Sequence, residues 1–188
     1  SKTHAAVLSA ILAAVLFGIS SPVSKILLTD IPPALMAALL YLGAGAGISL
    51  VNFIRRAKEG EPREARITRK DLPFVSGMIV LDIAAPLFLM LGLTITTAAN
   101  ASLLTNFEIA ATSLLALLIF KESIGKRLWA AIILITVSSV ILSLDNLGSF
   151  TFSLGSVFIL MACVCWGFEN NCTRMLSIKN PMEVVIIK

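Results

Sequence analysis

The amino-acid sequence predicts an all-α integral membrane protein, made of one five-helix repeat followed by the first helix of a second, inverted repeat. Apolar residues make up 57% of the 188 residues and charged residues 14%, with a mean hydropathy of +0.95. Soluble domains are about 45–50% apolar and about 25% charged. Apolar stretches of about 20 residues, long enough to cross a bilayer, recur along the chain. In addition, a short pattern near the N-terminus returns near the C-terminus.

The repeated pattern pairs residues 17–25, which read FGISSPVSK, with residues 166–174, which read WGFENNCTR. In each copy an aromatic residue precedes Gly, a short polar run follows, and a hydroxyl residue stands next to a cation. The same offset carries Pro32 onto Pro181. A repeat at fixed spacing is a signature of architecture, so these copies predict two related halves.

The first two predicted spans are residues 5–28 and 33–53, joined by a tight proline-containing turn. Pro22 lies inside the first span and removes one backbone donor, so we expect a kink there. Gly43 and Gly47 have the spacing that allows close helix packing in lipid, and we expect such packing along the second span.

The later spans are separated by polar segments, of which residues 54–71 form the longest. A short turn rich in Thr, Ala and Asn follows the third span, and a charged turn at 121–127 follows the fourth. The remaining predicted spans are 72–93, 101–120 and 128–144, which complete a first repeat at 5–144, and 156–176, which opens a second repeat at 153–188.

The distribution of positive charge predicts the orientation. If the spans alternate in direction, every Lys and Arg except Lys25 and Lys188 falls on one side of the membrane. Short loops rich in Lys and Arg stay in the cytoplasm, which predicts a cytoplasmic N-terminus in the cell membrane. Because each repeat has an odd number of spans, residues 156–176 enter the membrane from the side opposite to residues 5–28. Inverted repeats of this kind place a substrate site near the midplane, at the interface of the two halves.

Several functional classes are excluded. The net charge of +4 does not indicate nucleic-acid binding, because the cations lie between apolar spans. The three cysteines fall in one apolar segment without a nearby His, so no metal site and no disulfide framework is expected. An intramembrane protease would need an embedded His or a second embedded Asp, but His4 is terminal and Asp82 stands alone. We therefore expect neither an enzyme nor a cofactor.

Two carboxylates within spans are the first candidates for function, because an embedded Asp costs about 2.5–3.5 kcal/mol on insertion scales. Asp82 and Glu108 are both expected about 10–17 Å below the outer surface, where they could face one cavity. There they would bind a cationic group or carry a coupling proton. The structural alternatives are interhelical hydrogen bonding by Asp82 near Pro86, and packing of Glu108 against Asn106.

The repeated pattern supplies the other candidates. Ser20 and Ser21 in the first copy correspond to Glu169 and Asn170 in the second. In an inverted pair these polar runs would flank the central cavity from opposite sides, or would form hydrogen bonds between helices. Trp166 is expected either to pack as an anchor or to form part of a substrate platform.

The sequence resembles the EamA-type transporters of the drug/metabolite superfamily, which are ten-helix carriers built from two inverted five-helix repeats. The resemblance covers nearly the whole chain and is carried by residues 17–25 and 166–174 and by residues 114–122, which read LLALLIFKE and end in the acidic residue typical of the fourth helix. Phe17 stands where Trp is commoner, and Ile109 where Pro is frequent.

The resemblance implies a five-helix transporter repeat and a secondary transporter that exports small metabolites, such as amino acids or related solutes, by alternating access. No phosphate-binding loop is present for ATP-driven transport, so proton coupling and facilitated export both stay open. Two repeats imply about 300 residues, so we expect 188 residues to be a fragment. If 188 residues is the native length, the alternative is a non-transporting membrane subunit or a half-transporter that works as a homodimer. The expected partners are thus a small solute and the lipid bilayer.

Overall fold

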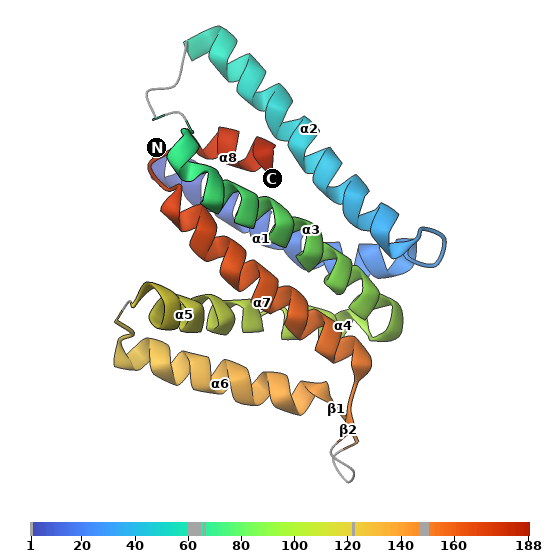
Figure 1. Ribbon diagram of the computed structural model, residues 1–188. Coiled ribbons are helices and arrows are strands. Elements are labelled where there is room, and N and C mark those ends of the chain that lie inside the picture. The colour runs from blue at the N-terminus through green and yellow to red at the C-terminus, as the bar shows by residue number, and fades with distance from the viewer. Residues whose placement is uncertain (1, 60–64, 66, 122, 147–150) are drawn as a thin grey trace.

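The fold is described from a computed structural model, which covers residues 2–59, 65, 67–121, 123–146 and 151–188 (Figure 1). The prediction of an all-α membrane protein is confirmed. Glu122, expected to close the fourth span, lies outside the described residues. The elements in chain order are α1 (Lys2–Leu27), α2 (Pro33–Glu59), the short 3₁₀ helix η1 (Arg69–Asp71), α3 (Leu72–Ile95), α4 (Ala98–Leu104), α5 (Phe107–Phe120), α6 (Lys126–Ser143), the antiparallel pair β1 (Leu144–Asn146) and β2 (Thr151–Phe152), α7 (Leu154–Met175) and α8 (Pro181–Ile187).

Within the described residues, 5 segments are helical, long and apolar enough to cross a membrane. They coincide with the predicted spans one to four and with the span after the β1–β2 link. These segments are Val7–Leu27, Pro33–Ala57, Arg69–Ile95, Ala98–Ile119 and Leu154–Met175. The predicted span at 128–144 is a helix as well, α6.

The fourth span differs from the expectation, because the single helix predicted at 101–120 is divided into α4 and α5. At the division, Thr105 Oγ1 donates to the carbonyl of Ser102 at 2.8 Å, and Asn106 Nδ2 donates to the carbonyl of Leu103 at 3.0 Å. Side chains that bond to nearby backbone carbonyls compete with the regular helix ladder. The division places Glu108 in the first turn of α5.

The centre of the fold is the contact between α3 and α7, which lie side by side in opposite directions (Figure 1). The two helices approach each other closely at Gly92 and Gly155: a Cβ added to Gly92 would lie 2.9 Å from the carbonyl oxygen of Gly155 and 2.7 Å from Ile159 Cγ1. Close packing through small residues is thus present here and not at Gly43 or Gly47, where an added Cβ would meet nothing within 4 Å.

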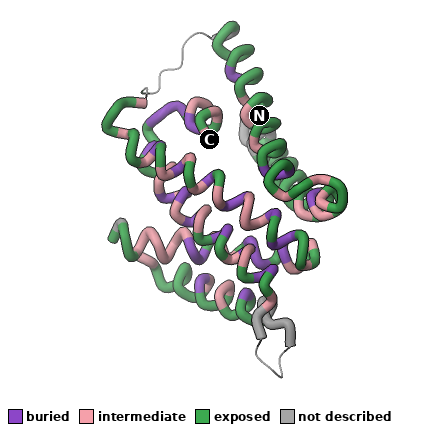
Figure 2. The backbone as a smooth tube through the Cα atoms, turned by 45° about the vertical axis from the view of Figure 1, so that its right-hand side comes forward, coloured by how far each residue is buried: buried purple, intermediate pink, exposed green. Residues whose placement is uncertain are grey.

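Two apolar clusters lie at opposite ends of this pair. One joins α2, α3, α4 and α7, and the other joins α3, α7 and α8. The buried members are Met36, Ala37, Met90, Leu93, Ala101, Leu104, Ile159 and Cys163 in the first cluster, and Val75, Met78, Leu176 and Val184 in the second. Figure 2 shows that buried residues concentrate on α3 and α7, whereas α1 and α2 are largely exposed. The polar groups described below lie between the two clusters.

The direction of α1 is fixed by its last turn. Lys25 Nζ donates to the carbonyls of Leu93 and Thr94, at the end of α3, so α1 and α3 end on the same side. Since α7 runs opposite to α3, α1 and α7 also run in opposite directions. An inverted pair of repeats requires this relation between its first helices, although the inversion of whole repeats stays a prediction.

Candidate functional site

The polar run of α7 has two faces. Residues three or four apart share one side of a helix. Trp166, Glu169 and Thr173 therefore lie on one face, and Gly167 and Asn170, together with Asn171, lie on another. Each face meets different helices.

The first face joins three helices through a chain of hydrogen bonds. Trp166 Nε1 on α7 donates to the hydroxyl oxygen of Tyr41 on α2 at 3.4 Å. The Tyr41 hydroxyl donates in turn to Asp82 Oδ1 on α3 at 3.3 Å. The expected interhelical role of Asp82 is present, with Tyr41 as its donor.

A lysine lies between two buried carboxylates on the same face. Lys188 Nζ forms ion pairs with Glu169 Oε1 and, at 3.6 Å, with Asp82 Oδ2. Thr173 Oγ1 also donates to Glu169 Oε1. Asp82 is 4% exposed and Glu169 2%. We name Asp82, Glu169 and Lys188 the charged cluster; its formal charges are two negative and one positive.

The charged cluster borders a cavity of about 170 Å³ between α2 and α3. The lining of the cavity is partly polar and mostly apolar. Its polar lining is Tyr41, Asp82 and Lys188, and its apolar lining is Ala34, Ala37 and Ala38 from α2 and Ile83, Pro86 and Leu87 from α3. A small solute entering this space would meet a carboxylate and an ammonium group against an apolar wall.

The second face of α7 packs on α5. A Cβ added to Gly167 would lie 3.0 Å from the backbone of Ala111 and of Thr112, so glycine permits this close approach. Asn170 Nδ2 donates to Glu108 Oε1 at 2.7 Å and to Thr112 Oγ1 at 3.2 Å. Asn171 Nδ2 donates to the carbonyl of Thr112 at 3.1 Å.

The structure therefore separates the two carboxylates that were expected to face one cavity. Asp82 is connected to the first face of α7 through Tyr41 and Lys188, and Glu108 accepts directly from Asn170 on the second face. Asn106 does not pair with Glu108: its amide donates to carbonyls of α4, and its side chain borders a different cavity, beside α6. Glu169 and Asn170, adjacent in sequence, belong to one face each.

The two serines of the first pattern are not brought to this site in the described structure. Ser20 is exposed on α1, and its hydroxyl donates to the carbonyl of Phe17 in its own helix at 2.7 Å. Ser21 is half-buried on the same helix. Trp166, by contrast, contributes directly through its indole N–H.

Sequence reasoning missed Tyr41 and Lys188. Tyr41 is the only tyrosine of the chain and lies within an apolar span, which was an available signal. Lys188 follows an apolar run, and its sequence position does not show that its side chain turns toward Asp82 and Glu169.

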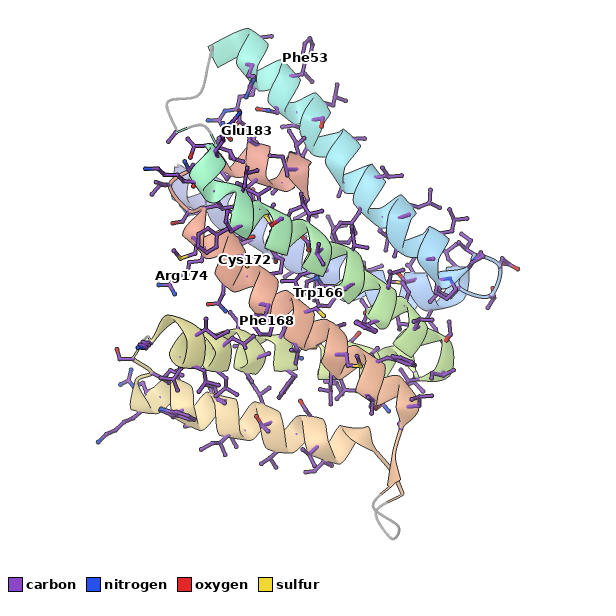
Figure 3. The ribbon with its side chains drawn as sticks, viewed as in Figure 1. Phe53, Trp166, Phe168, Cys172, Arg174 and Glu183 are labelled. Atoms are coloured by element: carbon purple, nitrogen blue, oxygen red, sulfur yellow. The ribbon has the colours of Figure 1, made fainter. Side chains whose placement is uncertain are left out.

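Two ion pairs connect α8 and the segment just before it to other helices at one end of the bundle. Lys179 Nζ lies 2.8 Å from Asp71 Oδ2, and Arg56 Nη2 lies 2.7 Å from Glu183 Oε1. Figure 3 shows Glu183 on α8 and Arg174 on the last turns of α7. These pairs connect α8 and the residue before its N-cap to α2 and to the segment before α3.

The two ion pairs are expected to differ in strength. The Lys179 side chain is 7% exposed and that of Arg56 41%. Lys179→Gln should lower the free energy of unfolding more than Arg56→Gln does, because the Lys179 side chain is nearly buried and loses a charged hydrogen bond. Arg56→Gln should cost less than about 1 kcal/mol, as exposed pairs do. Titration of the purified protein with SDS in mixed micelles measures both; equal losses would contradict this ranking.

Known proteins offer a comparison for this arrangement. A profile of the EamA-like transporter family matches residues 4–144. A curated protein of Methanothermobacter thermautotrophicus, described as an uncharacterized transporter, is 31% identical over 192 residues, which cover 93% of this chain and 54% of that protein. The chain thus spans about half the length of this relative. No solved structure matches the chain.

Proposed function

Because this chain belongs to the EamA-like transporter family, we propose that it carries small metabolites across the cell membrane as a secondary transporter. The family and the transporter-named relative point to a transporter rather than an enzyme. Transport proceeds by alternating access between two inverted repeats, the second supplied by the same polypeptide or by a second copy. The solutes are amino acids or related metabolites, and the direction is export, with the N-terminus in the cytoplasm.

The charged cluster is the observation that carries this proposal. Asp82 and Glu169 are almost fully buried within membrane-spanning helices, and Asp82 and Lys188 also line a cavity. Ionisable groups inside spans are costly and characteristically mark solute or ion pathways. A purely structural helix contact does not need charge, since neutral hydrogen bonds hold helices together in lipid.

Glu108 is the proposed proton carrier. It lies at the α5–α7 contact, where Asn170 donates to its carboxylate and Thr112 is close by. Glutamine keeps a side-chain oxygen that can accept from Asn170, but cannot release a proton. The substitution Glu108→Gln therefore tests proton exchange while keeping the hydrogen bond between the helices.

Glu108→Gln should reduce the rate of proton-driven solute uptake about ten-fold or more. A side chain that acts as a general acid or base typically contributes about 10²–10⁴-fold to the rate of a proton transfer. The measurement is uptake by liposomes that contain the full-length protein, under an imposed pH gradient, with a panel of amino acids. Glu183→Gln is the matched control, because Glu183 pairs with Arg56 outside the cluster. If Glu108→Gln and Glu183→Gln liposomes take up solute at the wild-type rate, Glu108 does not carry the coupling proton.

A further inference from the structure

We propose that Asp82 and Glu169 form a binding site for the ammonium group of a primary amine, and that Lys188 is a tethered occupant which the amine displaces. The inference rests on the proposed function and deepens it, since among amino acids and related metabolites it selects the related amines, which lack the carboxylate, for the same cavity. Its three supports are the charge balance, the hydrogen-bonding geometry and the lining of the cavity.

The charge balance favours a cation. Two carboxylates, 4% and 2% exposed, meet one ammonium group in the charged cluster. A buried charge is stable only when it is paired and hydrogen-bonded. With Lys188 in place the cluster carries one net negative charge, and without Lys188 two buried carboxylates would need a cation from elsewhere.

Lys188 lies closer to the carboxylate of Glu169 than to that of Asp82. Its Nζ is in ion-pair contact with Glu169 Oε1, but lies 3.6 Å from Asp82 Oδ2, beyond hydrogen-bond distance. Within the described residues, Asp82 Oδ2 is buried and has no hydrogen-bond partner. An ammonium group has three N–H donors. The ammonium group of a free amine, which no protein backbone restrains, can therefore donate to both carboxylates.

The cavity lining favours an amine over an amino-acid zwitterion. Among the described residues that line the cavity, Lys188 is the one cation that could receive a carboxylate. The rest of the lining, formed by alanines of α2 and by Ile83, Pro86 and Leu87 of α3, is apolar. A primary amine with a short alkyl body matches this division, with its ammonium group at Asp82 and its alkyl chain on the apolar wall.

The test measures binding of n-butylammonium to the purified full-length protein, by isothermal titration calorimetry at constant ionic strength. If the Lys188 side chain occupies the site most of the time, the apparent affinity of the wild type is reduced to the fraction of molecules in which the site is free. Removal of Lys188 abolishes this reduction. Lys188→Met is therefore expected to bind n-butylammonium about ten-fold more tightly than the wild type. Asp82→Asn introduced into Lys188→Met should abolish that gain. Lys25→Met is the matched control, because Lys25 bonds to carbonyls at the end of α3, away from the cluster.

Two neutral-charge probes define the ligand class. 1-Butanol shares the alkyl body without the charge, and norvaline adds a carboxylate; neither should gain affinity in Lys188→Met. Three results would overturn the inference. They are an equal gain in affinity for butanol or norvaline, an unchanged affinity of Lys188→Met for n-butylammonium, and the same gain in Lys25→Met.

The wild-type protein supplies a second test if Lys188→Met does not fold. n-Butylammonium should protect the wild type saturably against thermal unfolding, and Asp82→Asn, which keeps an acceptor for Tyr41, should remove that protection. Protection that persists in Asp82→Asn overturns the site.

The failure of this inference and the failure of the proposed function can be distinguished. Solute uptake by liposomes without n-butylammonium binding would remove this inference and leave the transporter, whereas binding without any uptake would leave the site and remove the proposed function.

Discussion

Gly92→Ala is expected to lower the free energy of unfolding by about 1–3 kcal/mol, the usual cost of an extra methyl group in a tightly packed interior. The new Cβ would lie 2.7 Å from Ile159 Cγ1 and 2.9 Å from the carbonyl oxygen of Gly155, so the backbones of α3 and α7 must move apart. A larger residue, as in Gly92→Leu, should prevent recovery of folded protein, because α3 and α7 form the centre of the bundle.

The matched control is Gly45→Ala on α2, where an added Cβ would meet nothing within 4 Å. Alanine favours a helix over glycine by about 1 kcal/mol, so this variant should be as stable as the wild type or more so. The measurement is SDS-induced unfolding in mixed micelles, followed by tryptophan fluorescence. Indistinguishable midpoints for Gly92→Ala and Gly45→Ala would show that the α3–α7 contact is not as close as described.

Glu169→Leu is expected to have the largest effect among single substitutions in the charged cluster, a loss of about 3–5 kcal/mol in the free energy of unfolding. It leaves the Lys188 ammonium, which is 21% exposed, with only Asp82 at 3.6 Å. Removing one partner of a buried pair exposes the other to an apolar environment, which is far more costly than replacing both.

The double variant Glu169→Leu with Lys188→Met should therefore recover much of the stability lost in Glu169→Leu. A double-mutant cycle measured by the same SDS titration gives the coupling between the two side chains. Glu183→Leu, which breaks the exposed pair with Arg56, is the control and should cost less than about 1 kcal/mol. Additive losses for Glu169 and Lys188 would mean that the two side chains are not an energetic pair.

The positions of the spans could be predicted from the sequence because each depends on local composition. The predicted spans at 72–93 and 156–176 agree closely with α3 and α7. The division of the fourth span was not predicted, since it depends on which carbonyls the Thr105 and Asn106 side chains reach.

The site could be predicted only in part, for a geometric reason. Counting residues along a span gives the depth of a side chain, and it predicts similar depths for Asp82 and Glu108. It does not give the direction in which a helix turns that side chain, so it could not separate the two across α7. Tyr41 and Lys188 meet Asp82 from distant parts of the chain, and such contacts follow from helix packing rather than from any local pattern.

The two faces of α7 have a mechanical consequence. Glu169 and Asn170 are consecutive, so their side chains are about 100° apart around one rigid helix. A roll of α7 about its axis would withdraw Glu169 from Lys188 and Asn170 from Glu108 in a single movement. If Glu108 exchanges the proton and the charged cluster holds the solute, rotation of α7 couples the release of the proton to the release of the solute. One rotation would then move one proton and one solute together.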